Sequence, residues 1–252
     1  MTGMGDGSSI GGENDLRVRF LYVVFGVVLS AIVLAALPDS ARADEEEEPT
    51  KPKTWHATAF ITGDMGTRVI DYWSKGPDMV ARTMINGRPV TTMVSGGRYV
   101  VFDGISGIGL NVARSARALK EDKGRKRPFA FEFEDIKKVG GEKIDDVTFG
   151  SRRVEVWQKS DASGRQKLWV SMGVPQIPLR LQTFDRGTAA NVELDYQNWI
   201  FDLEIPASFF ALPANIKFEV YEYDAYMTKS MEGRVSPMPV LYPDLLHGHP
   251  PS

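Results

Sequence analysis

The sequence predicts a mainly β protein, in which one strongly curved antiparallel sheet of about ten strands carries a helix on its concave face. Apolar residues recur at every second position over much of residues 54–227, beginning with Trp55, Ala57 and Ala59. This alternation gives a strand one apolar and one solvent-facing side. Turn signals separate the alternating stretches, at Gly140-Gly141, Ser163-Gly164, Gly173, Pro178 and Arg186-Gly187. Because tight turns join only antiparallel neighbours, we expect an antiparallel meander.

Several stretches show the alternation clearly and are expected to be strands. They are residues 54–61, 129–133, 153–156, 168–172, 179–182, 192–196 and 199–203. The apolar sides of successive strands must meet on one inner face of the sheet. The sheet is expected to end near Tyr223, and residues 207–212 are expected to form a short turn after Pro206.

One segment has the period of a helix instead. In residues 107–123, Leu110, Ala113 and Leu119 lie at helical spacing, and basic residues occupy the opposite side. Such a stripe is typical of an amphipathic helix. We therefore expect this helix to cover the inner face of the sheet.

Length and composition suit one substantial domain with extensions. The chain has 252 residues, a net charge of −3 and no cysteine. A small negative net charge gives no electrostatic basis for binding nucleic acid. The lack of cysteine excludes disulfide bonds, thiolate metal sites and a cysteine nucleophile.

The N-terminal region has the pattern of an export signal. Arg17 and Arg19 precede an uninterrupted apolar run over residues 20–37, and Ala41 and Ala43 form a small-x-small cleavage site. These features predict a secretory signal peptide that is cleaved after Ala43. The alternative is an uncleaved inner-membrane anchor, because a run of this length nearly spans a bilayer. Both interpretations place the rest of the chain in the periplasm.

Four regions follow from these patterns. Residues 1–43 form the N-terminal region with the signal segment, and residues 44–53 form an acidic linker that contains proline. Residues 54–227 are expected to be the folded domain. Residues 228–252 are rich in proline and are expected to be an extended tail.

No catalytic site, metal site or cofactor is predicted. Residues 104–108 lack the last glycine of a nucleophile elbow. His56 stands alone in an expected strand, and His247 and His249 lack a third ligand at metal-site spacing. The chain is therefore not expected to be an enzyme.

A basic cluster runs through the end of the expected helix and the residues after it. Its members are Arg114, Arg117, Lys120, Lys123, Arg125, Lys126 and Arg127. Such a cluster could contact anionic lipid head groups. Acidic residues interrupt the run, which favours a solvated helix face and loop instead.

Three motifs stand out in the second half of the chain: a turn before a strand at residues 140–147, an element close to G-x-P-L-R at residues 173–180, and I-P-A-S-F-F-A-L-P at residues 205–213. Together they resemble the LolA-like lipoprotein-carrier superfamily. The best match is residues 205–213, against the family's I-P-x-x-x-F-x-L-P. Asp146 replaces the usual glycine of the turn, and an extra Gln-Ile precedes Pro178.

The resemblance implies an unclosed half-barrel whose apolar hollow, under a helical lid, takes lipid tails. Carriers, an envelope-stress regulator and glycolipid-binding proteins share this fold, so the fold alone does not choose among them. The residues expected to line the hollow here are Trp55, Ala57, Ala59, Leu110, Phe131, Val170, Leu181 and Leu194. The plain alternative for the same residues is a solid core.

Two functional hypotheses follow. The first is a periplasmic, non-enzymatic binding protein for the acyl chains of a lipid or lipoprotein, driven by apolar burial. The second is an envelope sensor, regulator or scaffold, anchored through residues 20–37, that binds a protein partner through the same fold.

Overall fold

The computed structural model describes residues 53–64, 66–123, 125 and 127–249. The predicted signal segment and nearly all of the 44–53 linker lie outside these residues. Within the part described, no helix combines the length and hydrophobicity that a membrane crossing requires.

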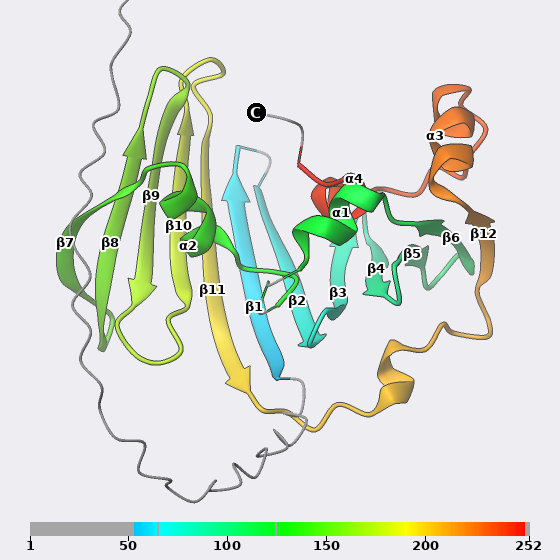
Figure 1. Cartoon of the computed structure of the whole chain (residues 1–252), viewed down its shortest axis with the longest axis horizontal. Helices are drawn as coiled ribbons and strands as arrows, with labels where there is room; N and C mark the ends of the chain where they lie inside the picture. Colours follow the sequence, from blue (N-terminus) through cyan, green and yellow to red (C-terminus); the bar gives the residue numbers. More distant parts are fainter. Residues whose placement is uncertain (1–52, 65, 124, 126, 250–252) are drawn as a thin grey trace, which may run out of the picture. The chain divides into compact units, whose positions relative to one another are not determined.

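A single twelve-stranded sheet organises the described chain, in the order β12-β6-β5-β4-β3-β2-β1-β11-β10-β9-β8-β7. The strands are β1 (Thr54–Gly63), β2 (Gly66–Lys75), β3 (Asp78–Ile85), β4 (Arg88–Ser95), β5 (Arg98–Asp103), β6 (Ile108–Ala113), β7 (Glu142–Phe149), β8 (Arg152–Ser160), β9 (Gly164–Ser171), β10 (Pro178–Asp185), β11 (Asn191–Phe201) and β12 (Lys217–Tyr221). The sheet curves and stays open, because β12 and β7 lie at opposite ends of the order (Figure 1). The expected mainly β, unclosed fold is confirmed, with twelve strands rather than about ten.

Two antiparallel meanders, β1–β6 and β7–β11, meet where β1 pairs with β11. The pairing sets Trp55 opposite Phe201 and Ala59 opposite Tyr196, with a shift of register between His56 and Thr58. Only one described pair departs from the expected antiparallel pattern, since β12 runs parallel to β6. The parallel partners β6 and β12 are far apart in the sequence, because a tight turn cannot join parallel neighbours.

Four short helices and one 3-10 turn accompany the sheet. They are α1 (Ala116–Glu121), α2 (Glu132–Lys138), η1 (Ala207–Phe210), α3 (Tyr223–Met231) and α4 (Pro243–His247). The helix α2 lies over β8, β9 and β10, while α1 and α4 lie side by side over the other half of the sheet (Figure 1). We call the face that these helices cover the inner face.

Side-chain alternation explains the two layers of core. On the inner face, Ala57, Ala59 and Val101 join a large buried cluster that also includes Leu245 and Leu246 of α4. The opposite face of the central strands has a smaller cluster. Its buried members are Val80, Met93 and Val100, and Phe209, Phe210 and Phe218 pack against them. Strands β3 to β5 are therefore apolar on both sides, because chain segments cover both.

The helix expected over residues 107–123 is only half present. Residues 108–113 form β6, and the helix α1 begins at Ala116 with Ser115 accepting a hydrogen bond from the Ala118 N–H. A Cβ at Gly109 would lie 2.6 Å from Phe218, so glycine permits β12 to pack closely here. The prediction was wrong because β5 and β12 satisfy the backbone of this segment from both sides.

The strand expected over residues 129–133 is also not formed. Ala130 has a φ of 58°, a left-handed conformation that ends an extended chain, and α2 starts at Glu132. Phe129 and Phe133 consequently belong to two different apolar clusters. The apparent alternation of phenylalanines reflects a loop followed by a helix.

The segment after residue 227 is not an extended tail. Residues 228–231 complete α3, and Leu245 and Leu246 of α4 are buried in the main cluster. The Ser115 hydroxyl donates a 2.8 Å hydrogen bond to the carbonyl of His247. Residues 228–249 thus pack on the folded domain, because their apolar side chains cover a part of the inner face that no other described segment covers.

Candidate functional site

An aromatic floor lies on the inner face where the two meanders meet. It consists of Trp55 of β1, Tyr72 of β2, and Tyr196 and Trp199 of β11. The ring centroids of Trp55 and Trp199 are 6.3 Å apart in an edge arrangement, and those of Tyr196 and Trp199 are 5.5 Å apart. Neighbouring strands bring these rings together, because cross-strand side chains on one face contact each other.

Residues 127–131 cover this floor, and we call them the covering segment. The segment lies between α1 and α2 and crosses in front of β1 and β2 (Figure 1). The Phe129 ring stacks on Tyr72 at 4.8 Å and on Trp199 at 5.9 Å, with interplanar angles of 8° and 17°. Within the described part of the chain, no backbone hydrogen bond joins residues 127–130 to a strand. Side-chain contacts therefore hold the segment in place.

Arg127, the first residue of the covering segment, is a buried cation. The residue is 3% exposed, and its guanidinium carbon lies 5.1 Å from the Trp55 ring and 5.5 Å from the Trp199 ring. Its Nη2 donates to the Ala130 carbonyl. Burial lowers the pKa of Arg127, while Glu134 and Glu132 act in the opposite direction. Guanidinium remains charged in such a setting, since its ordinary pKa is above 12.

A carboxylate and a phenol form the second polar pair. The Tyr196 hydroxyl donates a 2.8 Å hydrogen bond to Oε1 of Glu132. Burial raises the pKa of Glu132, and the hydrogen bond from Tyr196 opposes this shift. Burial and the nearby Glu132 together hold the pKa of Tyr196 well above its ordinary value. Both groups favour their neutral forms in this environment.

Several buried polar atoms around the floor lack a hydrogen-bond partner in the described structure. They are Nε1 of Trp55, Nε1 of Trp199, Nε of Arg127 and Oε2 of Glu132. Tyr242 contacts the floor through Tyr72, with ring centroids 5.9 Å apart. Buried polar groups are normally paired, and leaving one unpaired is costly. A cluster of such atoms beside an aromatic surface is a site where a polar group of a ligand would be accommodated.

The residues predicted to line a hollow divide between two places. Trp55, Ala57, Ala59 and Leu110 are buried in the main inner-face cluster, and Phe131 and Leu194 pack against it. Val170 is buried in a second cluster beneath α2, and Leu181 packs against it. Leu110 contributes from β6 rather than from a helix. The structure therefore brings six of the eight predicted residues to one cluster.

Sequence reasoning missed the polar members of the site. It placed Arg127 in a solvated basic cluster, and nothing singled out Glu132 or Tyr196. The local signal for Arg127 was its position next to the apolar residues Phe129 and Phe131. A charged residue next to such a run is compatible with both exposure and burial, so only the path of the chain decided between them.

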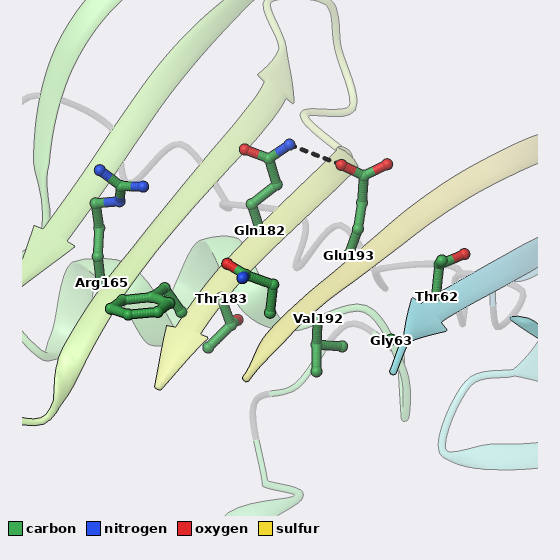
Figure 2. Close-up of a pocket in the computed structure, with 9 residues that line it drawn as sticks. Thr62, Gly63, Arg165, Gln182, Thr183, Val192 and Glu193 are labelled. Carbon is green, nitrogen blue, oxygen red and sulfur yellow. Dashed lines mark hydrogen bonds between the residues drawn. The ribbon is translucent and has the colours of Figure 1, made fainter. Parts of the chain in front are cut away.

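Three surface depressions lie away from the aromatic floor. Figure 2 shows one of about 430 Å³ at the ends of β1, β9, β10 and β11, where Gln182 donates a 2.7 Å hydrogen bond to Glu193. Its lining is Thr62, Gly63, Arg165, Gln182, Thr183, Phe184, Asn191, Val192 and Glu193. A second, of about 490 Å³, shares Arg165 and Phe184. A third, of about 750 Å³, adjoins residues 202–206. The predicted hollow residues line none of these three.

The histidines make ordinary polar contacts. Nδ1 of His56 lies 3.2 Å from the carbonyl of Asn198, and Nδ1 of His247 lies 2.9 Å from the Tyr223 hydroxyl. Nδ1 of His249 lies 2.9 Å from Glu121. Across residues 53–249, apart from the gaps, no group of three or more His, Asp or Glu side chains is placed to hold a metal ion.

Comparison with known proteins gives likenesses in structure only. No family model and no curated protein matches the sequence. An uncharacterized conserved protein from Thermus thermophilus is 9% identical with a TM-score of 0.48, over 66% of this chain and 90% of that one. A putative outer membrane lipoprotein-sorting protein domain from Vibrio parahaemolyticus is 14% identical with a TM-score of 0.30, over 63% and 89%.

A third likeness is to the MucA/MucB complex of Pseudomonas aeruginosa. It is 9% identical with a TM-score of 0.41, over 66% of this chain and 57% of that chain. At these identities the likenesses concern the fold alone. An open, curved sheet is also what the motif resemblance of residues 140–213 implies.

Proposed function

We propose that this protein is a non-enzymatic binding protein of the cell envelope, which takes acyl chains on the aromatic floor beneath the covering segment. One observation carries the proposal. Phe129 is stacked between Tyr72 and Trp199, yet it sits on a segment with no backbone hydrogen bond to a strand among the described residues. An acyl chain can take the place of the Phe129 ring, because the ring is held by the faces of two aromatic side chains and an acyl chain can make the same apolar contacts.

Approximate energies favour a long chain over a short one. Removing a buried phenylalanine costs about 3 kcal/mol of burial, and losing two aromatic stacks adds about 1 to 3 kcal/mol. Each buried methylene contributes about 0.8 kcal/mol, so ten methylenes contribute about 8 kcal/mol. Four methylenes contribute only about 3 kcal/mol and do not offset the loss. Binding should therefore set in at an intermediate chain length.

Two further observations support export and lipid binding. The N-terminal pattern of Arg17, Arg19 and the apolar run over residues 20–37 is that of a segment directed across the inner membrane. The motifs in residues 140–213 resemble a superfamily that binds lipid tails. Together they favour a periplasmic ligand that is apolar.

A binding assay tests the proposal directly. The exported protein is titrated with methyl esters of straight-chain acids from four to sixteen carbons, with tryptophan fluorescence and calorimetry as readouts. Affinity should rise with chain length, and Phe129→Ala should bind the long esters more tightly because the side chain to be displaced is gone. Phe133→Ala is the matched control, since Phe133 lies in the second cluster. If neither wild type nor Phe129→Ala binds any of the esters or the corresponding straight-chain acids, the proposal is wrong.

The second candidate function is an envelope scaffold or sensor that binds a protein partner. The observation in its favour is the sheet edge at β7, which ends the strand order and is mostly exposed, including Ile144 at 50%. An unpaired edge can accept a strand from another chain. Retention of the 20–37 segment in the mature protein, together with failure to bind esters, would favour this function.

A further inference from the structure

Arg127 carries a buried charge that no carboxylate of the described residues contacts directly. Among the residues that the structure describes, no aspartate or glutamate forms an ion pair with it, and its Nε has no hydrogen-bond partner. Its contacts are the faces of Trp55 and Trp199 and the carbonyl of Ala130. Proteins rarely bury a charge unless it is paired, because desolvation of an ion is expensive.

The other buried arginine of the described chain shows the usual solution. Arg114 pairs with Asp122 at 2.6 Å, and it also donates to the carbonyl of Leu245. Both arginines come from the same basic stretch of sequence, and both are almost fully enclosed. Arg127 differs in facing aromatic rings where Arg114 faces a carboxylate. The lack of an ion-pair partner is therefore specific to the surroundings of Arg127 and is not shared by the whole basic stretch.

The atoms around Arg127 are suited to receive an anion. Trp55 and Trp199, whose rings face the guanidinium, each have an indole N–H without an acceptor. Glu134 and Glu132 are the nearby acids that oppose the effect of burial on the pKa of Arg127, but neither forms an ion pair with it among the described residues. Hydrogen bonds from cations and N–H groups to an anion are stronger than those to neutral acceptors.

We propose that Arg127 is the counter-charge for an anionic head group, a carboxylate or a phosphate, of an amphiphile whose chain lies on the aromatic floor. This inference rests on the proposed function and specifies the class of ligand. The chain displaces Phe129, and the head group then lies against Arg127, where it accepts hydrogen bonds from Nε and from the indole N–H groups. The ligand is thus an anionic single-chain lipid rather than a neutral one.

Three ligands of equal chain length test this inference at pH 7.5. They are dodecanoate, dodecyl phosphate and methyl dodecanoate, titrated against wild type and Arg127→Met. Wild type should bind at least one of the two anions about tenfold or more tightly than the ester, as expected for hydrogen bonds to a charged group. Arg127→Met should bind the anions and the ester within about twofold of one another, with ester affinity unchanged. The two anion arms tell a carboxylate ligand from a phosphate ligand.

Control variants separate this effect from a loss of folding. Arg125→Met removes a neighbouring cation that faces Phe131 at 4.2 Å, and it should retain the preference for the anion. Arg127→Lys keeps the charge and should keep part of the preference, which gives a second test if the methionine variant does not fold.

Each outcome has a distinct meaning. Equal affinity of wild type for anions and ester overturns this inference but leaves acyl binding intact. Anion preference that persists in Arg127→Met also overturns it, because another group then holds the head. No binding of any of the three ligands overturns the proposed function itself.

Discussion

The Tyr196 hydroxyl donates a 2.8 Å hydrogen bond to Oε1 of Glu132, and this bond joins the first residue of α2 to β11. It lies at the end of the covering segment, which has no backbone hydrogen bond to a strand in the described chain. This hydrogen bond therefore ties the chain just after the covering segment to the aromatic floor.

Removal of that contact should weaken the attachment of the cover. Tyr196→Phe leaves the buried carboxyl of Glu132 without its described side-chain donor, which should lower the free energy of unfolding by about 1 to 3 kcal/mol. Urea unfolding measures the change. The matched control is Tyr221→Phe, whose hydroxyl bonds to Glu219, a carboxylate that Ser236 also contacts. A smaller loss for Tyr196→Phe than for the control would contradict the role of this bond.

The buried carboxyl of Glu132 should make stability fall as pH rises. Its pKa in the folded protein is raised above the ordinary value of 4.5, so the folded state holds the proton more tightly than the unfolded chain. The stabilising effect is complete below pH 4.5 and is lost as pH rises from there through the folded pKa. Glu132→Gln does not titrate.

The difference in stability between Glu132→Gln and wild type should therefore shift in favour of the variant over this pH range. Urea unfolding from pH 4 to pH 8 measures it. A pH-independent difference would show that Glu132 titrates as it does in the unfolded chain.

Gly109 should be required for the packing of β6 against β12. A Cβ at this position would lie 2.6 Å from Phe218 and 2.8 Å from Phe102. Gly109→Ala should lower the free energy of unfolding by about 1 to 3 kcal/mol, as overpacking does. At Gly104 the nearest atom would lie 4.0 Å away, so Gly104→Ala is the matched control and should change stability by less than about 1 kcal/mol. Equal effects at both sites would argue against a close approach of β12.

The C-terminal helix α4 should contribute to the core. Leu246 is fully buried, so Leu246→Ala should cost about 2 to 5 kcal/mol in urea unfolding. Leu212, which is 46% exposed, provides a control in which the same substitution should cost much less. Near-equal costs would mean that residues 243–247 do not pack as the structure has them.

Export should remove the first 43 residues. The Ala41-x-Ala43 pattern predicts that the mature protein starts at Asp44. Protein sequencing of the N-terminus from an envelope fraction measures this directly. A start at Met1 or Thr2 would instead support an uncleaved anchor and, with it, the scaffold function.

Local sequence patterns were enough to predict most of the sheet. The two-residue period is a local property, because successive side chains of a strand point to opposite sides, and it marked Trp55, Ala57 and Ala59 as one inner face. It also grouped Leu110 and Leu194 with that face, although it assigned Leu110 to a helix. The alternation and a few turn motifs were enough to predict a curved antiparallel sheet. The family resemblance added that the sheet is unclosed.

Only the tertiary structure decided which segments cover the sheet and which charges are buried. Residues 108–113 suit a helix or a strand, and they form a strand because β5 and β12 pair with them. Residues 235–246 pack on the domain because part of the inner face is otherwise uncovered. Arg127 lies on two tryptophans, one from β1 and one from β11, that are 144 positions apart in the sequence (199 − 55). Burial and electrostatic pairing depend on distances between remote residues, which a local pattern does not contain.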